Sequence, residues 1–148
     1  MQRFQFRLER ALEWQRNQRK LAEEEVRLSL LAIAETDQRA ATLKALRAAV
    51  DQDVITRPAV TAADLSALAR FRNRAKRDAA GLARRKSEQV QVLDRHRVRL
   101  TNEHRRERLF EKLRERALSE YTRELDREME ALAAECHLAR WTAQAGAI

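Results

Sequence analysis

Apolar residues recur along the first third of the chain at alternating steps of four and three positions. This heptad spacing is typical of a helix that packs one face against another helix in a coiled coil. Nine of the 14 positions in the series are apolar, which predicts one long helix over about 5–54. The series is Leu8, Leu12, Gln15, Arg19, Ala22, Val26, Ser29, Ile33, Thr36, Ala40, Leu43, Arg47, Val50 and Val54.

The pattern stops at residues 53–61, which contain Pro58, the only proline. The residue before a proline is pushed out of helical geometry. We therefore expect a connection at 55–61. Thr61 stands three residues before Asp64, the spacing of a capping box at a helix start. The sequence thus predicts that a second helix starts at about residue 62 and continues to about 141.

The second helix carries the same spacing as far as Leu100, and seven of 11 positions are apolar. Beyond Leu100 the apolar positions change phase, which predicts a stutter between about 103 and 117. We expect residues 142–148 to fray. The first series is Leu65, Leu68, Arg72, Ala75, Ala79, Leu82, Lys86, Gln89, Leu93, His96 and Leu100. The later series is Leu118, Thr122, Leu125, Met129, Leu132, Cys136 and Ala139.

Turn-forming residues are scarce, with 2 Gly and 1 Pro in 148 residues, against an average usage of roughly 12% for the two together. This scarcity excludes β-sandwiches, barrels and enzymes built on loops. The prediction is a single all-α domain, an antiparallel two-helix coiled-coil hairpin with the longer helix second. If residue i faces residue 116 − i, Phe4 lies opposite Lys112, and the rest of the second helix extends past the first with its apolar stripe exposed.

Positive charge is concentrated in residues 70–116, which hold 17 Lys/Arg and 7 Asp/Glu, whereas 117–148 hold 3 and 6. The formal net charge of the whole chain is +8. Such a segment could bind the phosphates of nucleic acid or an anionic membrane. Basic residues interspersed with acidic ones are also typical of the solvated face of a coiled coil, the interpretation we favour, and we expect no nucleic acid partner.

No catalytic or ligand-binding motif is present. The single Cys136 cannot form a disulfide within the chain, which suits a reducing compartment. No two histidines are four residues apart, and there is no glycine-rich phosphate loop. We therefore expect no enzyme activity, cofactor, metal or small-molecule substrate. Charge interrupts the N-terminus, so no signal peptide is expected, and the apolar stretch 28–34 is too short to span a bilayer.

One group of N-terminal residues falls at helical spacing on a face away from the heptad positions. Trp14 is therefore expected to be partly exposed, flanked by Arg7 and Arg10. Exposed Trp and Arg are enriched where proteins bind one another. The alternative is that this face packs on the second helix near Leu109 and Phe110. The group is Phe4, Arg7, Ala11 and Trp14.

Four motifs occur in a recognisable order: FQFRLERALEW at 4–14, AEEEV at 22–26, TAADL at 61–65 and FEKLRERALSEY at 110–121. With the break between them, they resemble the flagellar export protein FliJ family over essentially the whole chain. The segment MEALAAECHLAR at 129–140 departs from that pattern, because it is Ala-rich where the family often carries more acidic residues.

The resemblance implies a cytoplasmic coiled coil similar to the stalk subunit of rotary ATPases, placed peripherally at the cytoplasmic face of the inner membrane. Its implied partners are the hexameric flagellar export ATPase, the membrane protein of the export gate, and export chaperones. The candidate residues for binding the ATPase ring are Phe4, Arg7, Arg10, Trp14, Phe110, Lys112, Arg114 and Tyr121.

Three alternatives stay open at this point. The chain could be the equivalent stalk protein of a virulence injectisome. It could instead bind nucleic acid or anionic membrane through residues 70–116. It could also be a homodimeric scaffold that buries the stripe at 118–139 in a second copy.

Overall fold

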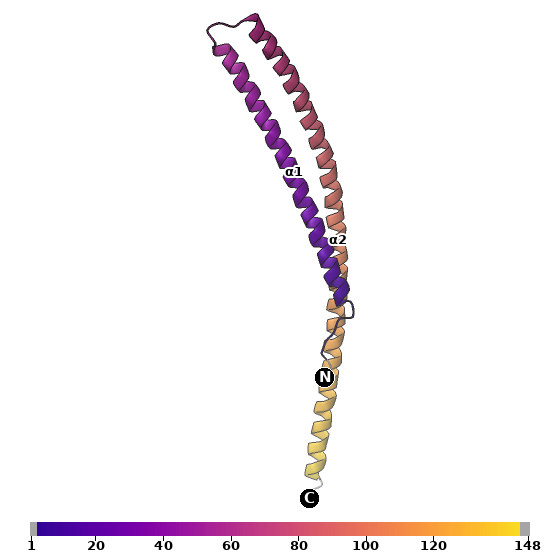
Figure 1. Cartoon of the computed structure of the whole chain (residues 1–148). Helices are drawn as coiled ribbons and strands as arrows, with labels where there is room; N and C mark the ends of the chain where they lie inside the picture. Colours follow the sequence, from indigo (N-terminus) through magenta and orange to yellow (C-terminus); the bar gives the residue numbers. More distant parts are fainter. Residues whose placement is uncertain (1–2, 146–148) are drawn as a thin grey trace. The chain divides into compact units, whose positions relative to one another are not determined.

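Two long helices make up almost all of the computed structural model, which describes residues 3–145 and side chains as far as Thr142. They are α1 (Glu9–Thr56) and α2 (Ala62–Ala145), joined by residues 57–61 (Figure 1). No strand occurs within residues 3–145. The predicted all-α class, with two helices and the longer one second, is confirmed.

The first helix begins later than predicted, at Glu9 and not near residue 5. The N–H of Glu9 donates to the carbonyl of Phe6 at 3.1 Å, and the N–H of Leu12 donates to that of Leu8 at 2.9 Å. The reason for the later start is that Phe4 and Phe6 are half-buried while the residues between and around them are exposed. Such a two-residue alternation belongs to an extended chain and not to a helix.

The second helix starts with the predicted capping box (Thr61 and Asp64). The Thr61 N–H donates to Asp64 Oδ2 at 3.0 Å, and the Asp64 N–H donates to the Thr61 hydroxyl at 3.2 Å. The hydroxyl also donates to the same carboxylate at 2.7 Å. Hydrogen bonds from the Thr61 hydroxyl and N–H hold the pKa of Asp64 below its ordinary value. These bonds satisfy amide groups that the first turn leaves without helical partners.

The other helix ends lie slightly beyond their predicted positions. α1 continues through Thr56, two residues past the expected end. α2 continues through Ala145, so residues 142–145, predicted to fray, are helical. The rest of the predicted frayed tail, 146–148, lies outside the described residues.

Contacts divide the chain into two units, and each helix contributes to both. Unit 1 contains Met1–Arg19 and Glu103–Ile148, and unit 2 contains Lys20–Asn102.

The two helices of unit 2 are antiparallel. Going along α1 to higher residue numbers, the contact partners on α2 have lower residue numbers. The residue numbers in each pair add to between 123 and 125. The pairs are Glu25 with Arg99, Ser29 with His96, Thr36 with Gln89, Asp37 with Lys86 and Asp51 with Arg72.

The predicted register, in which residue i faces 116 − i, is therefore wrong by about eight residues. It assumed that the chain folds back symmetrically about Pro58. Instead, pairing between the helices starts several residues into α2, and Leu65 near its start is 56% exposed. Loop geometry sets this offset, and the heptad pattern does not report it.

The predicted heptad positions of α1 in unit 2 form its contact face. Every one from Ala22 to Val54 is buried or half-buried except Arg47. On α2, Ala75 and Leu93 are buried. Polar side chains share this narrow face, because Ser29 Oγ lies 2.8 Å from His96 Nδ1 and the Thr36 hydroxyl donates to Gln89 at 2.9 Å.

Candidate protein-binding surface

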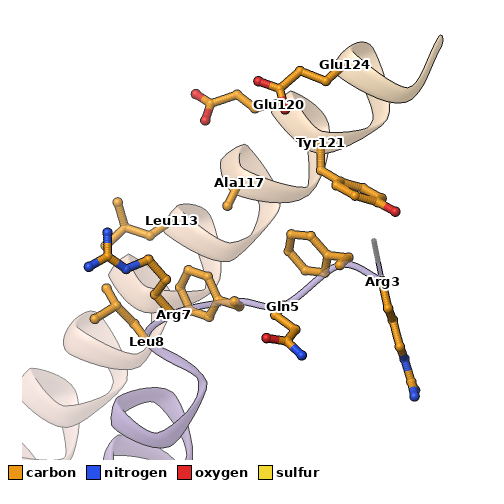
Figure 2. A pocket seen from close by; sticks show the side chains of 11 residues that line it. Arg3, Gln5, Arg7, Leu8, Leu113, Ala117, Glu120, Tyr121 and Glu124 are labelled. Carbon is orange, nitrogen blue, oxygen red and sulfur yellow. The ribbon is translucent and has the colours of Figure 1, made fainter. Parts of the chain in front are cut away.

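The N-terminal strap, residues 3–8, lies along α2 within unit 1 and is not helical (Figure 2). The rings of Phe4 and Tyr121 lie 5.5 Å apart between centroids and are tilted by 53°. This geometry is favourable for an aromatic pair. Phe4 therefore faces Tyr121, and the prediction that it faces Lys112 is wrong.

An open groove of about 1040 Å³ lies between the strap and α2 (Figure 2). Its floor is partly apolar, with Leu113 and Ala117, and both charges occur on its walls. Arg3 and Arg7 come from the strap, and Glu120 and Glu124 come from α2, so the groove could hold a mixed polar and apolar peptide surface. The full lining is Arg3, Phe4, Gln5, Phe6, Arg7, Leu8, Leu113, Ala117, Glu120, Tyr121 and Glu124.

A buried polar layer follows the strap within unit 1. Gln15 is almost fully buried and donates from Nε2 to the carbonyl and to the carboxylate of Glu103. Glu103 is itself buried and also accepts from Arg106 at 3.1 Å. Hydrogen-bonded polar pairs at such positions set the register of a coiled coil at a cost in stability.

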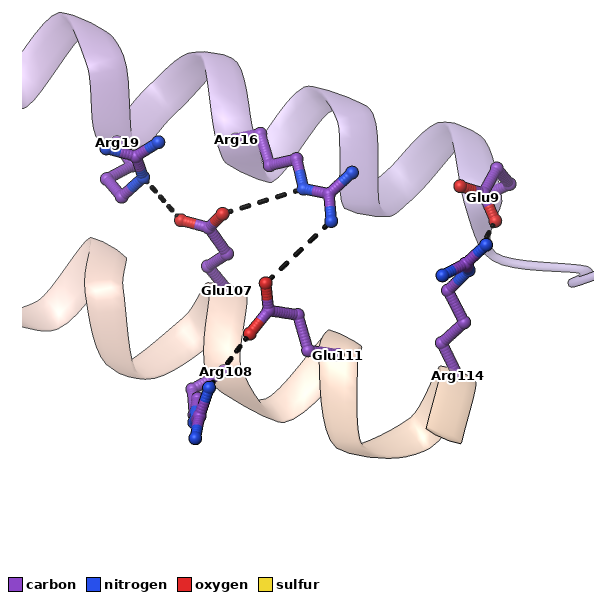
Figure 3. Close-up of polar contacts among 7 residues, drawn as sticks. All are labelled: Glu9, Arg16, Arg19, Glu107, Arg108, Glu111 and Arg114. Atoms are coloured by element: carbon purple, nitrogen blue, oxygen red, sulfur yellow. Dashed lines mark hydrogen bonds and ion pairs between the residues drawn. The ribbon is translucent and has the colours of Figure 1, made fainter. Parts of the chain in front are cut away.

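Glu107 extends this layer with two arginines from α1 (Figure 3). The Arg19 Nε lies 2.6 Å and the Arg16 Nε 3.6 Å from its carboxylate oxygens. Arg16 also reaches Glu111 at 3.8 Å. The layer therefore joins the helices of unit 1 through a buried carboxylate, whereas the ion pairs between the helices of unit 2 are more exposed.

The change of phase on α2 lies later than predicted. Buried or half-buried side chains keep the first register through the charged stretch, at Glu103, Glu107, Phe110 and Ala117. Tyr121 and Leu125 then follow at steps of four. The stutter therefore lies at 121–125 and not between 103 and 117, because two buried carboxylates continue the contact face where apolar residues are missing.

The C-terminal segment, residues 126–142, makes no burying contact with the described chain. Every side chain in it is exposed, although the helix continues throughout. Met129 and Leu132 share one face of the helix with Cys136 and Ala139 and form the apolar stripe, whereas the exposed Leu138 and Trp141 lie on the opposite side. An apolar helical stripe of this length that is left in water is typical of a binding surface.

The structure brings some of the predicted ATPase-binding residues together and separates others. Phe4 and Tyr121 are in contact, and Arg114 forms an ion pair with Glu9 at 3.2 Å (Figure 3). Phe110 is half-buried on the contact face, whereas the remaining four are exposed. These four are Arg7, Arg10, Trp14 and Lys112.

The predicted face of Phe4, Arg7, Ala11 and Trp14 does not exist as one helical face, because residues 3–8 are not helical. The predicted exposure of Trp14 is confirmed at 59%. Leu109 is 62% exposed, so Trp14 is not buried against it as the alternative required. Sequence reasoning did not single out Phe6, which is half-buried in the strap, although the F-x-F alternation signals an extended segment.

The basic residues of α2 in unit 2 are divided between ion pairs and open solvent. Arg72, Lys86 and Arg99 pair with carboxylates of α1. Arg74 and Arg84 pair with acidic residues one turn later on α2 itself. This distribution is what a solvated coiled-coil face shows.

The described residues contain no group of three or more His, Cys, Asp or Glu side chains able to hold a metal ion. Cys136 is exposed on α2. Neither helix, as far as it is described, has a stretch apolar and long enough to cross a bilayer.

Comparison with known proteins gives no further information about the surface. No protein-family model, no curated protein and no solved structure matches this chain.

Proposed function

We propose that this chain is a non-enzymatic coiled-coil stalk of the flagellar type III export apparatus. It binds the centre of the hexameric export ATPase, promotes assembly or activity of that ring, and links it to the export gate and to substrate chaperones. It acts in the cytoplasm at the inner membrane. The proposal combines the resemblance of the sequence motifs to the FliJ family with the surfaces of unit 1.

The observation that carries the proposal is the C-terminal segment. Residues 126–142 form a continuous helix with an apolar stripe that no described part of the chain covers. A second protein that covers Met129 and Leu132, with Cys136 and Ala139 on the same face, would remove this apolar surface from water. A stalk that enters a ring needs such a surface, whereas an enzyme needs a pocket with placed chemical groups.

Trp14 and Arg10 offer a second contact within unit 1. Both are exposed, and Arg10 has no ionic partner among the described residues. Tryptophan and arginine are the residue types that most often dominate binding energy at protein interfaces. The strap and its groove lie in the same unit and enlarge the surface available to a partner.

The mechanism follows from a mismatch of symmetry. A two-helix chain has no six-fold axis, so inside a hexameric ring it contacts different subunits differently. It stabilises the closed, nucleotide-bound conformation of the subunits it touches, and thereby changes the populations of ring states without taking part in hydrolysis.

The test is a titration of purified flagellar export ATPase with this chain, with ATP turnover and hexamer yield as readouts. Both should rise. The double variant Met129→Glu/Leu132→Glu should lower the effect at least about tenfold, because charge replaces the apolar contact. Trp14→Ala/Arg10→Ala should also weaken it.

The control is Ile55→Glu, which places one new glutamate on an apolar side chain that is 74% exposed in unit 2. It should behave as the parent. The proposal is wrong if the parent changes neither readout, or if the control and the double variant lose activity equally while all keep their helical circular dichroism.

The second candidate function is binding of phosphates by the basic residues of α2. A stalk of a virulence injectisome is the alternative form of the first candidate function, the flagellar stalk. Exposed Arg77 and Arg85, which pair with no acidic residue in the described part of the chain, are the observation in favour of phosphate binding. Affinity for nucleic acid or anionic vesicles would then fall steeply with salt, whereas an aromatic and apolar contact with the ATPase would weaken less. Affinity for flagellar and injectisome ATPases, measured side by side, separates the two stalk systems.

A further inference from the structure

A second open groove, of about 470 Å³, lies between α1 and α2 within unit 2. Its lining is mainly small and apolar, with Ala40 and Leu43 from α1 and Ala75, Ala79 and Leu82 from α2. Alanine at several neighbouring contact positions leaves space that larger side chains fill elsewhere in a coiled coil. Ala79 is exposed and Ala40, Leu43 and Leu82 are half-buried, whereas Ala75 is buried, so the groove opens onto an apolar floor that this unit covers only in part.

The rim of the groove is positively charged. Lys44, Arg47 and Lys86 line it, against one carboxylate, Asp37. Lys86 pairs with Asp37 at 2.7 Å. Lys44 and Arg47 have no ionic partner in the described part of the chain. An occupant that carries apolar residues between carboxylates would match both the floor and the rim.

The C-terminal segment has this composition. Residues 117–142 hold three arginines and six acidic residues. Glu128 and Glu135 directly precede Met129 and Cys136, which belong to the exposed apolar stripe. The carboxylates therefore flank the stripe at heptad spacing, in the way that interhelical salt bridges require.

The lengths of the two surfaces also agree. At a rise of 1.5 Å per residue, the groove extends over about 17 Å of α1, from Thr36 to Arg47. The stripe from Met129 to Ala139 extends over about 15 Å. Three turns of one helix would thus fill the groove from end to end.

We propose that the C-terminal segment of one copy of this chain docks in the unit 2 groove of a second copy. The segment lies against α1 and α2 as a third helix, with Met129 and Leu132 on the alanine floor and Glu128 and Glu135 near Lys44 and Arg47. The contact joins two different surfaces, so it is heterologous, and association either closes into a small oligomer or continues into longer chains.

Self-association goes beyond the proposed stalk function and would regulate it. The same stripe would be covered by a second copy in the free protein and by the ATPase ring in the export apparatus. The ATPase would then compete with self-association. The experiment below uses this chain alone, so its failure is distinct from a failure of the stalk proposal.

The test is sedimentation velocity of the full chain over a range of concentrations at low and high salt. The parent should associate as concentration rises, and less so at high salt because the rim contacts are screened. Ala79→Leu fills the groove, and Leu132→Glu places a charge on the apolar stripe. Each should weaken association by about tenfold to a hundredfold.

Mixing the two variants is the decisive step. Ala79→Leu keeps an intact segment and Leu132→Glu keeps an intact groove, so the mixture should form a one-to-one complex that neither variant forms alone. Arg47→Glu should weaken association of the parent, whereas Arg70→Glu, an exposed arginine outside the groove, should not. Thermal unfolding of each variant, with no loss of helix, confirms that the fold is intact.

Three results would overturn the proposal. The parent could sediment as a monomer at every concentration. Ala79→Leu could associate as the parent does, which would show that the C-terminal segments pair with each other. The mixture of the two variants could also fail to form the complex, which would show that groove and segment do not meet.

Discussion

Unit 1 and unit 2 differ in the types of side chain that are buried at their heptad contact positions. In unit 2 the buried contact positions hold the uncharged side chains of Ala22, Ala75 and Leu93, with Thr36 bonded to Gln89. In unit 1 buried Gln15, Glu103 and Glu107 occupy them, beside Leu12. Apolar contacts stabilise a coiled coil without fixing how the helices slide, whereas a paired polar layer permits one register.

This difference suits the functions proposed for the two units. A surface that binds a partner has to be presented at a fixed position, and the polar layer fixes the strap and α2 of unit 1 in register. The alanine-rich contact face of unit 2 leaves a groove open instead. Where the apolar core is narrow, each buried side chain carries a large share of the stability.

The largest loss of stability is expected when a buried apolar side chain of unit 2 is shortened. Leu93 is 4% exposed, and Leu93→Ala should lower the free energy of unfolding by about 3 kcal/mol. Urea unfolding followed by circular dichroism measures the loss, and amide exchange should quicken within residues 20–102. Val98→Ala, at an exposed position of the same helix, is the control. Equal losses for both variants would contradict the assigned contact face.

A smaller loss of stability is expected when one partner is removed from the buried polar layer of unit 1. Gln15→Leu should lower stability by about 1–2 kcal/mol, because Glu103 loses a buried hydrogen-bond donor. The double variant Gln15→Leu/Glu103→Leu should recover most of this loss, since paired replacement of buried polar partners by apolar ones is often neutral.

A double-mutant cycle on Gln15 and Glu103 measures the coupling directly by urea unfolding. If the layer sets register, the stable double variant should also lose the Phe4–Tyr121 contact, which is measurable as a nuclear Overhauser effect between the rings. A coupling near zero would mean that the two side chains do not depend on each other. An unchanged ring contact in the double variant would mean that the layer does not set register.

The heptad pattern was sufficient to predict the class of fold and the contact face of α1, because one period governs burial along a continuous helix. It failed at the N-terminus, where Phe4 and Phe6 alternate with polar residues over too few positions to be noticed. It also failed for the register, since a shift along the helices leaves the heptad pattern of each helix unchanged.

The candidate site was harder to predict than the fold. Glu103 and Glu107 follow Leu100 at heptad steps of three and four, so their positions were visible in the sequence. Their charge argued against burial, because a lone buried carboxylate is costly. Gln15, Arg16 and Arg19 on the other helix, together with Arg106 on α2, make that burial tolerable, and pairing the α1 residues with α2 requires the register.

The smallest change is expected when the capping box of Thr61 and Asp64 is lost. This box lies in unit 2, at the start of α2. Because hydrogen bonds from Thr61 lower the pKa of Asp64, its contribution to stability is present above the ordinary value of 3.8 and is lost as pH falls through the lower, folded-state value. Titration of the Asp64 carboxyl by carbon NMR should therefore show a midpoint below 3.8.

Thr61→Ala should return the midpoint toward 3.8 and quicken amide exchange in the first turn of α2, while exchange at residues 9–19 of unit 1 stays as in the parent. An Asp64 midpoint at its ordinary value in the parent would show that the box is not formed, and changed exchange at 9–19 would show that the two units do not respond separately.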